Sequence, residues 1–172
     1  MVGTSGVGKT TLSAAIADRL GLAHTEIDSL YHGPNWVPRP EFMDDVHAFI
    51  AGEEWVTEWQ YSQARHAVAT RATLAVWLDY PVRVRMARNI RRTVRRRLRR
   101  ERLWNDNIEP PLTTFFTDRE HIIRWAWRTR HMYDDLPDRL VELGRPDLPI
   151  VRLGSQDEAD LWLASLPLGD GG

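Results

Sequence analysis

The chain has 172 residues, of which 42% are hydrophobic and 27% charged, and its formal net charge is -1. This length and composition favour one globular domain and exclude a disordered or fibrous chain. The absence of cysteine excludes disulfides and thiolate metal sites, and because we find neither a signal sequence nor an apolar run of roughly 18 residues, we expect a cytoplasmic protein with no membrane contact.

A glycine-rich loop opens the chain. Residues 3–10, GTSGVGKT, match the phosphate-binding pattern G-x-x-x-x-G-K-[ST], and a helical pattern that ends at Gly21 follows. The glycines let several backbone N–H groups point at one phosphate, and the helix N-terminus adds a positive dipole. The pattern therefore predicts nucleotide binding by Gly3, Thr4, Ser5, Gly6, Val7, Gly8, Lys9, Thr10 and Thr11.

Lys9 is the single lysine among 23 basic residues, and all the others are arginine. A random placement of that lysine would reach position 9 in about one case in 23, so its position favours a chemical need for an ammonium group there. In this motif the lysine reaches the outer phosphates and the hydroxyl after it binds Mg²⁺. We therefore expect Lys9 to be catalytic and Thr10 to be a metal ligand.

Only Met1 and Val2 precede the loop. Such a loop normally follows a buried strand of about five residues. We therefore expect a truncated first strand, a chain that begins inside a longer natural sequence, and nucleotide binding weakened by the shortened anchor.

Strands and helices alternate along the rest of the chain. We predict strands at 22–28, 54–59, 74–80 and 149–155, and helices at 40–53, 62–72, 81–104 and 156–166. A capping box of Thr117 and Glu120 predicts one more helix, with an inner side of Ile122, Trp125, Ala126, Thr129, Tyr133 and Leu136. This order predicts an α/β fold with a parallel sheet covered on both faces and ligands at its carboxyl edge.

Two aspartates stand where predicted strands end. Asp28 ends the strand 22–28, at the edge where a phosphate acceptor would lie, so it is a candidate to orient or deprotonate an acceptor hydroxyl. A turn or helix-capping role is the alternative for Asp28. Asp79 ends the strand 74–80, but with Pro81 close behind it is more typical of a turn.

Positive charge is concentrated in residues 83–102, which hold eleven arginines and one acid, so that this segment carries +10 and the remainder of the chain -11. The apolar residues of this segment recur every three or four positions, which predicts one amphipathic helix with an inner face of Val84, Ala87, Ile90, Val94 and Leu98. Three interpretations stay open. The segment is a solvated surface, a surface for nucleic acid, or a lid that stabilises a transferred phosphoryl group through Arg88, Arg92, Arg95 and Arg96.

Taken together, these motifs resemble a bacterial family called topology modulation proteins, which are similar to adenylate kinases. The resemblance covers nearly the whole chain and rests, in order, on Gly3–Thr11, 26–36 (EIDSLYHGPNW), 55–62 (WVTEWQYS), 76–81 (VWLDYP), 88–96 (RNIRRTVRR) and 103–107 (LWNDN). It implies a three-layer P-loop NTPase fold of the nucleoside-monophosphate-kinase type, with sheet order 2-3-1-4-5 and a helical, arginine-rich lid.

The resemblance also implies ATP binding. In similar kinases an acid at the end of the third strand helps to organise Mg²⁺, so Glu58 joins Thr10 as an expected metal residue, while Trp59 replaces a glycine of the family and is expected to crowd the site. Trp104, Asn105 and Asn107 follow the basic helix. Asn105 and Asn107 are candidates to read the edge of a base. Trp104 is a candidate to stack on a base, and its alternative is hydrophobic packing of the lid on the body of the protein.

We therefore expect a single domain at 1–168, with a lid at about 88–117 and a disordered tail at 169–172. The expected function is transfer of the ATP γ-phosphoryl group to a small acceptor such as a nucleoside or nucleotide. The alternative is a nucleotide-switched protein that binds DNA or a partner through residues 83–102, with little kinase turnover. The two functions differ in whether the arginines converge on the glycine loop or point outward.

Overall fold

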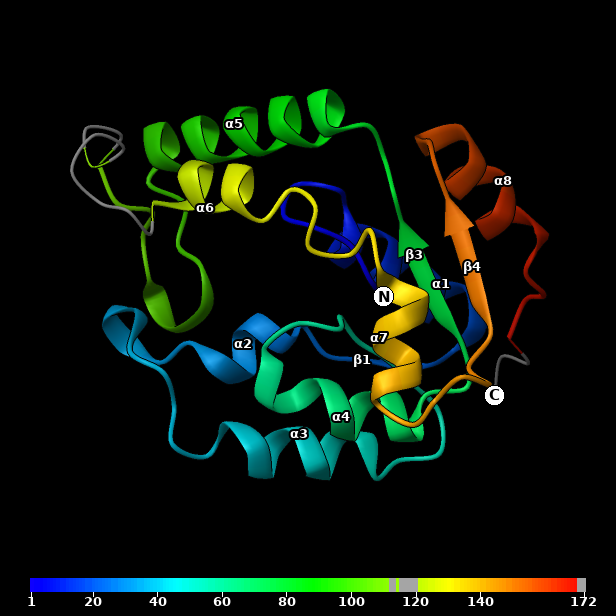
Figure 1. The fold of residues 1–172 in the computed structure, drawn as a ribbon. Helices are drawn as coiled ribbons and strands as arrows, with labels where there is room; N and C mark the ends of the chain where they lie inside the picture. The colour runs from blue at the N-terminus through cyan, green and yellow to red at the C-terminus, as the bar shows by residue number, and fades with distance from the viewer. Residues whose placement is uncertain (112–113, 115–120, 170–172) are drawn as a thin grey trace.

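A computed structural model describes residues 1–111, 114 and 121–169 and shows an α/β arrangement of helices around short parallel strands (Figure 1). Its strands are β1 (Ala23–His24), β2 (Trp55–Val56), β3 (Ala75–Leu78) and β4 (Ile150–Leu153). Its α-helices are α1 (Lys9–Leu20), α2 (Ile27–Tyr31), α3 (Phe42–Ile50), α4 (Ser62–Arg71), α5 (Val82–Arg99), α6 (Ile122–Arg128), α7 (Leu136–Glu142) and α8 (Gln156–Ser165). Two 3₁₀ turns, η1 (Pro34–Trp36) and η2 (Trp104–Asp106), lie in the connections.

The strands form two parallel pairs. β1 pairs with β2 and β3 pairs with β4. Met1 and Val2 lie between the pairs: the Val2 N–H donates to the Val76 carbonyl at 2.8 Å, and the Met1 ammonium donates to the Thr57 carbonyl at 2.6 Å. The segment Met1–Val2 therefore hydrogen-bonds to β3 on one side and to the residue after β2 on the other.

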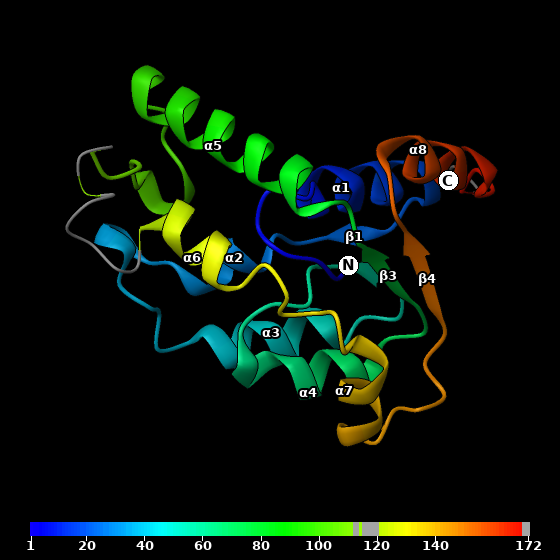
Figure 2. The same ribbon diagram turned by 45° about the horizontal axis from the view of Figure 1, so that its top comes forward.

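Helices cover both faces of these strands, as Figures 1 and 2 show. Alternate side chains of β3 belong to two different clusters of buried residues, because successive side chains of a strand point to opposite faces. Ala75 and Trp77 pack with residues of α3, α4 and α7. Val76 and Leu78 pack with residues of α1 and α8. The predicted α/β fold with both faces covered is confirmed at this level.

Two predicted strands are shorter than expected. The segment 22–28 forms a strand only at Ala23–His24, and the chain then turns into α2, so that Asp28 lies in the first turn of a helix and not at a strand end. The segment 54–59 forms a strand only at Trp55–Val56. The predicted helix with Ile122 and Leu136 on one side is instead two helices, α6 and α7, separated by turns.

The buried face of α5 differs from the prediction, although Val84, one of the five expected inner residues, is partly buried and packs against the core. Leu98 is 74% exposed and Ile90 is 43% exposed, whereas Arg85, Asn89 and Thr93 are buried. These three residues are four apart, so they lie on one side of the helix. On this polar side Arg85 donates a hydrogen bond to the Thr4 hydroxyl of the glycine loop, and α5 also lies against α6.

Some expectations lie outside the described residues, namely the capping box of Thr117 and Glu120, positions 112, 113 and 115–117 of the lid, and the tail residues 170–172. Gly169, expected to be disordered, donates a backbone hydrogen bond to the Arg19 carbonyl at 2.7 Å. Within the described ranges, no helix is long and apolar enough to cross a membrane.

Candidate functional site

The glycine loop, Gly3–Thr11, curls between Val2 and the first turn of α1. Gly6 has a φ of 81° and Gly8, which caps α1, has a φ of 105°, values that favour glycine. A Cβ atom on Gly6 would lie 2.6 Å from the Arg85 carbonyl oxygen and 2.8 Å from Cβ of Asn89. Gly6 is therefore required both by the backbone turn and by the close approach of α5.

Lys9 turns back into the loop. Its side chain is only 7% exposed, and its ammonium donates to the carbonyl oxygens of Gly3 at 2.8 Å and Thr4 at 3.3 Å. Burial lowers the pKa of Lys9 to about 8, while the negative charges of Asp28 and Glu58 act in the opposite direction. A buried ammonium held only by carbonyl oxygens is poorly compensated, so this position favours an incoming anion.

Three arginines of α5 reach the glycine loop. Arg85 donates to the Thr4 hydroxyl at 2.8 Å, and Arg92 donates to the Ser5 hydroxyl at 3.1 Å. Arg88 donates to the Val7 carbonyl at 3.4 Å, and its guanidinium lies 5.2 Å from the centre of the Tyr80 ring. Burial, and next the neighbouring charge of Arg96, lower the pKa of Arg92. The inner side of α5 thus concentrates positive charge over the loop.

The other two predicted catalytic arginines do not reach the loop. Arg95 pairs with Glu101 at 3.2 Å, and its side chain is 55% exposed. Arg96 lies 3.7 Å from a carboxylate oxygen of Glu109, which places it one turn further along the lid. Of the four arginines expected to act together, only Arg88 and Arg92 contact the glycine loop.

Asp28 faces the site from α2. Its carboxylate accepts a hydrogen bond from the Tyr61 hydroxyl at 2.5 Å and another from the Gln60 amide at 3.3 Å. Burial lowers the pKa of both Lys9 and Arg92, and the negative charge of Asp28 opposes this lowering in part. Burial and the charge of Asp28 raise the pKa of Tyr61, so that the phenol stays a donor to the carboxylate.

Glu58 lies under the loop, with a side chain that is 1% exposed. Its Oε2 accepts from the backbone N–H of Ile27 at 3.0 Å, so it caps the start of α2. Its Oε1 has no hydrogen-bond partner among the described residues and lies 3.9 Å from Nε2 of His24. The structure gives no contact between Glu58 and Thr10, which lies in the first turn of α1.

Trp59 does not crowd the site. Its ring is buried in the core beside Tyr133, and its indole N–H donates to the Arg65 carbonyl at 2.8 Å. Asp79 pairs with Arg152 at 2.5 Å, which is a structural role at the end of β3. Within the described residues, no group of three or more His, Asp or Glu side chains is arranged to hold a metal ion.

Two loops with the same backbone features contact each other directly. The loops 32–38 and 102–108 each contain a 3₁₀ turn, two consecutive residues with positive φ, and a bridge between their end residues. The Asn107 amide joins them, because it donates to the Gly33 carbonyl at 2.9 Å and accepts from the Trp36 N–H at 3.0 Å. We call this pair of loops the clasp.

Aromatic rings reinforce the clasp. The Trp104 indole stacks on His32 with ring centres 6.1 Å apart and donates to the Glu26 carboxylate at 2.8 Å. The Asn105 amide donates to the His32 carbonyl at 2.6 Å. Trp104, Asn105 and Asn107 therefore join the loop 102–108 to the loop 32–38 and to Glu26, which agrees with the packing interpretation of Trp104.

Several residues of the site were not expected from the sequence. Tyr61 and Gln60 orient Asp28, and Arg85 and Asn89 form the side of α5 that contacts the loop. The sequence does contain a signal for Arg85 and Asn89, since polar residues recur four positions apart at 85, 89 and 93.

No family model matches this chain, and no curated protein matches it. Its function is therefore inferred from its own residues and their contacts.

Proposed function

We propose that the protein is a P-loop kinase that binds ATP with Mg²⁺ and transfers the γ-phosphoryl group to a hydroxyl of a small acceptor, such as a nucleoside or nucleotide. The observation that carries the proposal is the glycine loop itself, in which the buried Lys9 ammonium and the inner arginines of α5 converge. Four negative charges of a triphosphate would compensate this concentration of cations.

The arrangement of the strands supports a P-loop fold. The hydrogen bonds of Met1 and Val2 fit a central first strand, with β2 on one side and β3 on the other. With Met1–Val2 as strand one, the side-by-side order corresponds to 2-3-1-4-5. The resemblance to topology modulation proteins predicts the same order, and membership of that family is part of the proposal.

Each residue has a chemical task in this mechanism. The loop amides and Lys9 bind the β- and γ-phosphates, and Asp28 takes the proton of the acceptor hydroxyl. The acceptor oxygen forms a bond to the γ-phosphorus, the bond from that phosphorus to the β-phosphate oxygen breaks, and ADP leaves. Arg88 and Arg92 stabilise the negative charge on the transferred group.

The donor set fits a magnesium ion bound together with the nucleotide. The Thr10 hydroxyl would hold the ion, and the unpaired Oε1 of Glu58 would accept from water bound to it. Mg²⁺ would neutralise charge on the β- and γ-phosphates.

The proposal is tested by ATP consumption and phosphorylated product, measured with a panel of nucleosides, nucleotides and sugars. Lys9→Met serves as the inactive variant, and Arg99→Met, at the exposed end of α5, serves as a matched control. The expected result is product with at least one acceptor, abolished by Lys9→Met and retained by Arg99→Met. Failure of the protein to bind ATP would overturn the proposal.

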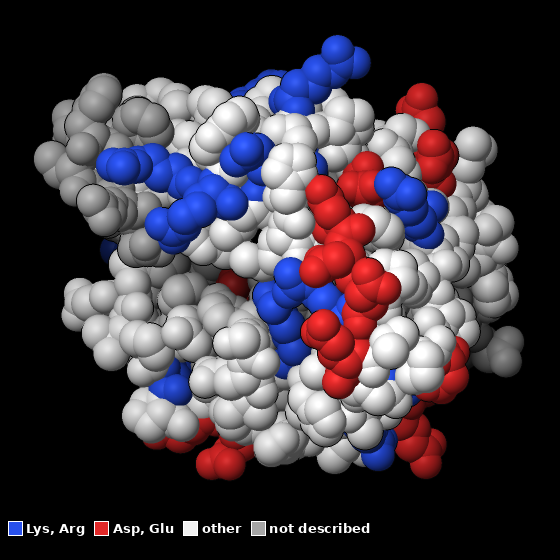
Figure 3. Space-filling model, in the orientation of Figure 1, with Lys and Arg blue, Asp and Glu red and all other residues white. Residues whose placement is uncertain are grey.

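A second candidate function, nucleotide-dependent binding of DNA or a partner, is favoured by the outer side of α5. Arg83, Arg91 and Arg99 are exposed there. Figure 3 shows basic side chains in the upper part of the molecule, and others beside an acidic cluster in the middle of the view. A steep loss of DNA affinity with rising salt, weakened when these three arginines are replaced by alanine, would support this function. Binding without phosphorylated product would favour it over the kinase.

A further inference from the structure

The proposed site divides its charge between two sides. Residues 22–71, which the structure describes in full, hold Asp28 together with seven further acids and only three arginines, a formal charge of -5 (3 minus 8). We call this segment the acceptor side. Residues 83–102, which supply the arginines that reach the glycine loop, carry +10. A triphosphate therefore suits one side of the site, whereas the other side repels anions.

Each of the three arginines on the acceptor side has partners away from the site. Arg39 pairs with Asp45 at 2.9 Å. The Arg65 guanidinium lies 5.5 Å from the centre of the Trp59 ring, beside the core. Arg71 donates to two backbone carbonyls that follow α3, at 3.3 and 3.4 Å. These contacts leave none of the three to bind a phosphate group of an acceptor.

His32 adds no positive charge on the acceptor side. Its Nε2 lies 3.1 Å from the Tyr61 hydroxyl, which donates to Asp28. Burial lowers the pKa of His32 below its ordinary value of 6.5, and the negative charge of Asp28 opposes this only in part, so the imidazole is neutral at pH 7. On the acceptor side, the surroundings of Asp28 thus offer hydrogen bonds but no cation.

Two carboxylates at the start of α2 each keep one oxygen without a partner. Both hydrogen bonds to Asp28 end on Oδ1, and the hydrogen bond to Glu26, from the Trp104 indole, ends on Oε2. Among the described residues, neither carboxylate forms an ion pair. In the space-filling view, an acidic side chain is visible in a recess between the upper and lower parts of the molecule (Figure 3). A phosphate group placed beside these carboxylates would meet like charge.

The arginines on the inner side of α5 do not offset this repulsion. Arg88 and Arg92 contact the glycine loop, where they would meet the triphosphate of ATP. Arg96 lies 3.7 Å from a carboxylate oxygen of Glu109, which is only 7% exposed. A second phosphate group, on the acceptor, would compete with ATP for the same two arginines at the loop.

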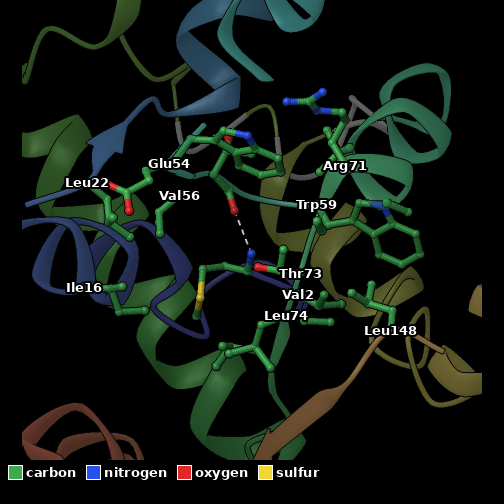
Figure 4. A pocket seen from close by; sticks show the side chains of 18 of the residues that line it. Val2, Ile16, Leu22, Glu54, Val56, Trp59, Arg71, Thr73, Leu74 and Leu148 are labelled. Carbon is green, nitrogen blue, oxygen red and sulfur yellow. Dashed lines mark hydrogen bonds between the residues drawn. The ribbon is translucent and has the colours of Figure 1, made fainter. Parts of the chain in front are cut away.

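An apolar cavity elsewhere in the protein is a poor place for the acceptor. It has a volume of about 400 Å³ and lies between the two strand pairs, surrounded by apolar side chains that include Leu22, Val56 and Leu74 (Figure 4). Neither Lys9 nor Asp28 lines this cavity. A general base must lie within hydrogen-bond reach of the hydroxyl that it deprotonates. The acceptor therefore belongs with Asp28, among the acids of the acceptor side.

We propose that the acceptor is a hydroxyl compound without a phosphate group, a nucleoside or a sugar, and that the charge of the acceptor side excludes its phosphorylated form. The inference rests on the proposed kinase function and narrows it, because a nucleotide acceptor is excluded. In the transfer, the acceptor oxygen bonds to the γ-phosphorus, the hydroxyl proton passes to Asp28, and ADP leaves. The product is a monophosphate, and the same charges keep it from serving as an acceptor again.

The test compares matched pairs of acceptors at saturating ATP and Mg²⁺. The four ribonucleosides, ribose and glucose are each compared with the corresponding monophosphate, and kcat/KM for phosphorylated product is measured. At least one unphosphorylated compound is expected to react better than its monophosphate by about 100-fold or more. Whether that compound is a nucleoside or a sugar distinguishes the two sources. A monophosphate that reacts as well as its unphosphorylated partner, or better, would overturn the proposal.

Titration of the same protein with ATP separates this inference from the proposed function. ATP binding without product from any of the unphosphorylated compounds would overturn the inference alone. Absence of ATP binding would overturn the proposed function, and the inference with it.

Glu26→Gln tests whether charge is the cause of the selection. The amide oxygen can still accept from the Trp104 indole, but one negative charge of the acceptor side is lost. The kcat/KM of the monophosphate relative to its unphosphorylated partner should rise by about tenfold. Glu41→Gln, at an exposed position before α3, is the control and should leave this ratio within about twofold. An equal ratio in the two variants would overturn the role of charge.

Discussion

The two sides of α5 carry the same residue type in opposite settings. On the inner side Arg85 and Arg92 are held by hydroxyls of the glycine loop, and Asn89 packs against Gly6. On the outer side Arg91 and Arg95 are exposed, and the acceptor recorded for Arg95 is the nearby Glu101. The difference shows that helical register, and not the number of arginines, decides which of them contact the glycine loop.

The contacts on the inner side of α5 also explain how several positively charged side chains can lie close to Lys9. Each inner arginine has an oxygen acceptor, and Asp28 and Glu58 contribute negative charge nearby. The outer side needs no such compensation because water solvates it. Substitutions on the inner side should therefore have larger effects on activity than substitutions on the outer side.

The largest effect is expected from Lys9→Met. Removing the one buried ammonium of the loop should weaken ATP binding by about 1,000-fold, because truncating a buried charged partner costs several kcal/mol. Isothermal titration with ATP and Mg²⁺ measures this, with Arg99→Met as the exposed control. Comparable ATP affinity in the two variants would show that the loop is not the nucleotide site.

Asp28→Asn should reduce turnover by roughly 100- to 1,000-fold and leave ATP affinity unchanged, because an amide cannot accept the acceptor's proton. Asp44→Asn, at an exposed position of α3, is the matched control. Steady-state kinetics with the best acceptor of the panel, together with ATP titration, separate the two effects. A variant that loses ATP binding and turnover equally would point to a structural role for Asp28 as the partner of Tyr61.

Arg92→Ala and Arg91→Ala test the two sides of α5 directly, since the residues are adjacent in sequence. Loss of the inner Arg92 should lower kcat by about 100-fold, because one preorganised donor to the transferred group is removed. Loss of the outer Arg91 should leave kcat within about twofold. Equal kcat values for the two variants would remove the distinction between the inner and outer sides.

ATP binding should also weaken as the pH rises. The pKa of Lys9 in the unliganded protein is lowered to about 8, so its charge is lost above that pH, while arginines keep theirs. If only the ammonium form binds, affinity falls by about 16-fold between pH 8 and 9.5. In Lys9→Met the same change of pH should have no such effect, and an equal slope in both proteins would assign the titration to another group.

The sequence was sufficient for the parts of the molecule that depend on local pattern. The alternation of strands and helices and the helix that begins at Lys9 were predicted correctly. The pattern was misleading for α5, because it assigns apolar residues to the buried face, whereas Arg85, Asn89 and Thr93 are the buried residues. The sequence pattern of α5 alone cannot show that the glycine loop, which faces this side of the helix, presents hydroxyl and carbonyl groups.

The residues that surround Asp28 could not be predicted from the sequence, because they too are set by tertiary contacts. Tyr61 reaches Asp28 from a backbone with a φ of 51°, which is uncommon for a residue with a side chain. Such a conformation is imposed by tertiary packing, here by stacking of the Tyr61 ring on Tyr31 at 3.9 Å. The sequence placed an acid near the site but gave no sign of the group that orients it.

The smallest effect is expected at the clasp, which lies far along the lid from the contacts between α5 and the loop. Asn107→Ala removes the side chain that joins Gly33 and Trp36, and each of these two lost hydrogen bonds costs about 1 kcal/mol, so the closed lid should be disfavoured by up to about 30-fold. An open lid admits water, so the ratio of ATP hydrolysis to acceptor phosphorylation should rise while ATP affinity stays unchanged.

Measuring ADP and phosphorylated acceptor in parallel gives this ratio, and Arg102→Ala, which removes only an exposed ion pair with Asp106, is the control. An unchanged ratio in Asn107→Ala would mean that the clasp stabilises the fold without controlling access to the site.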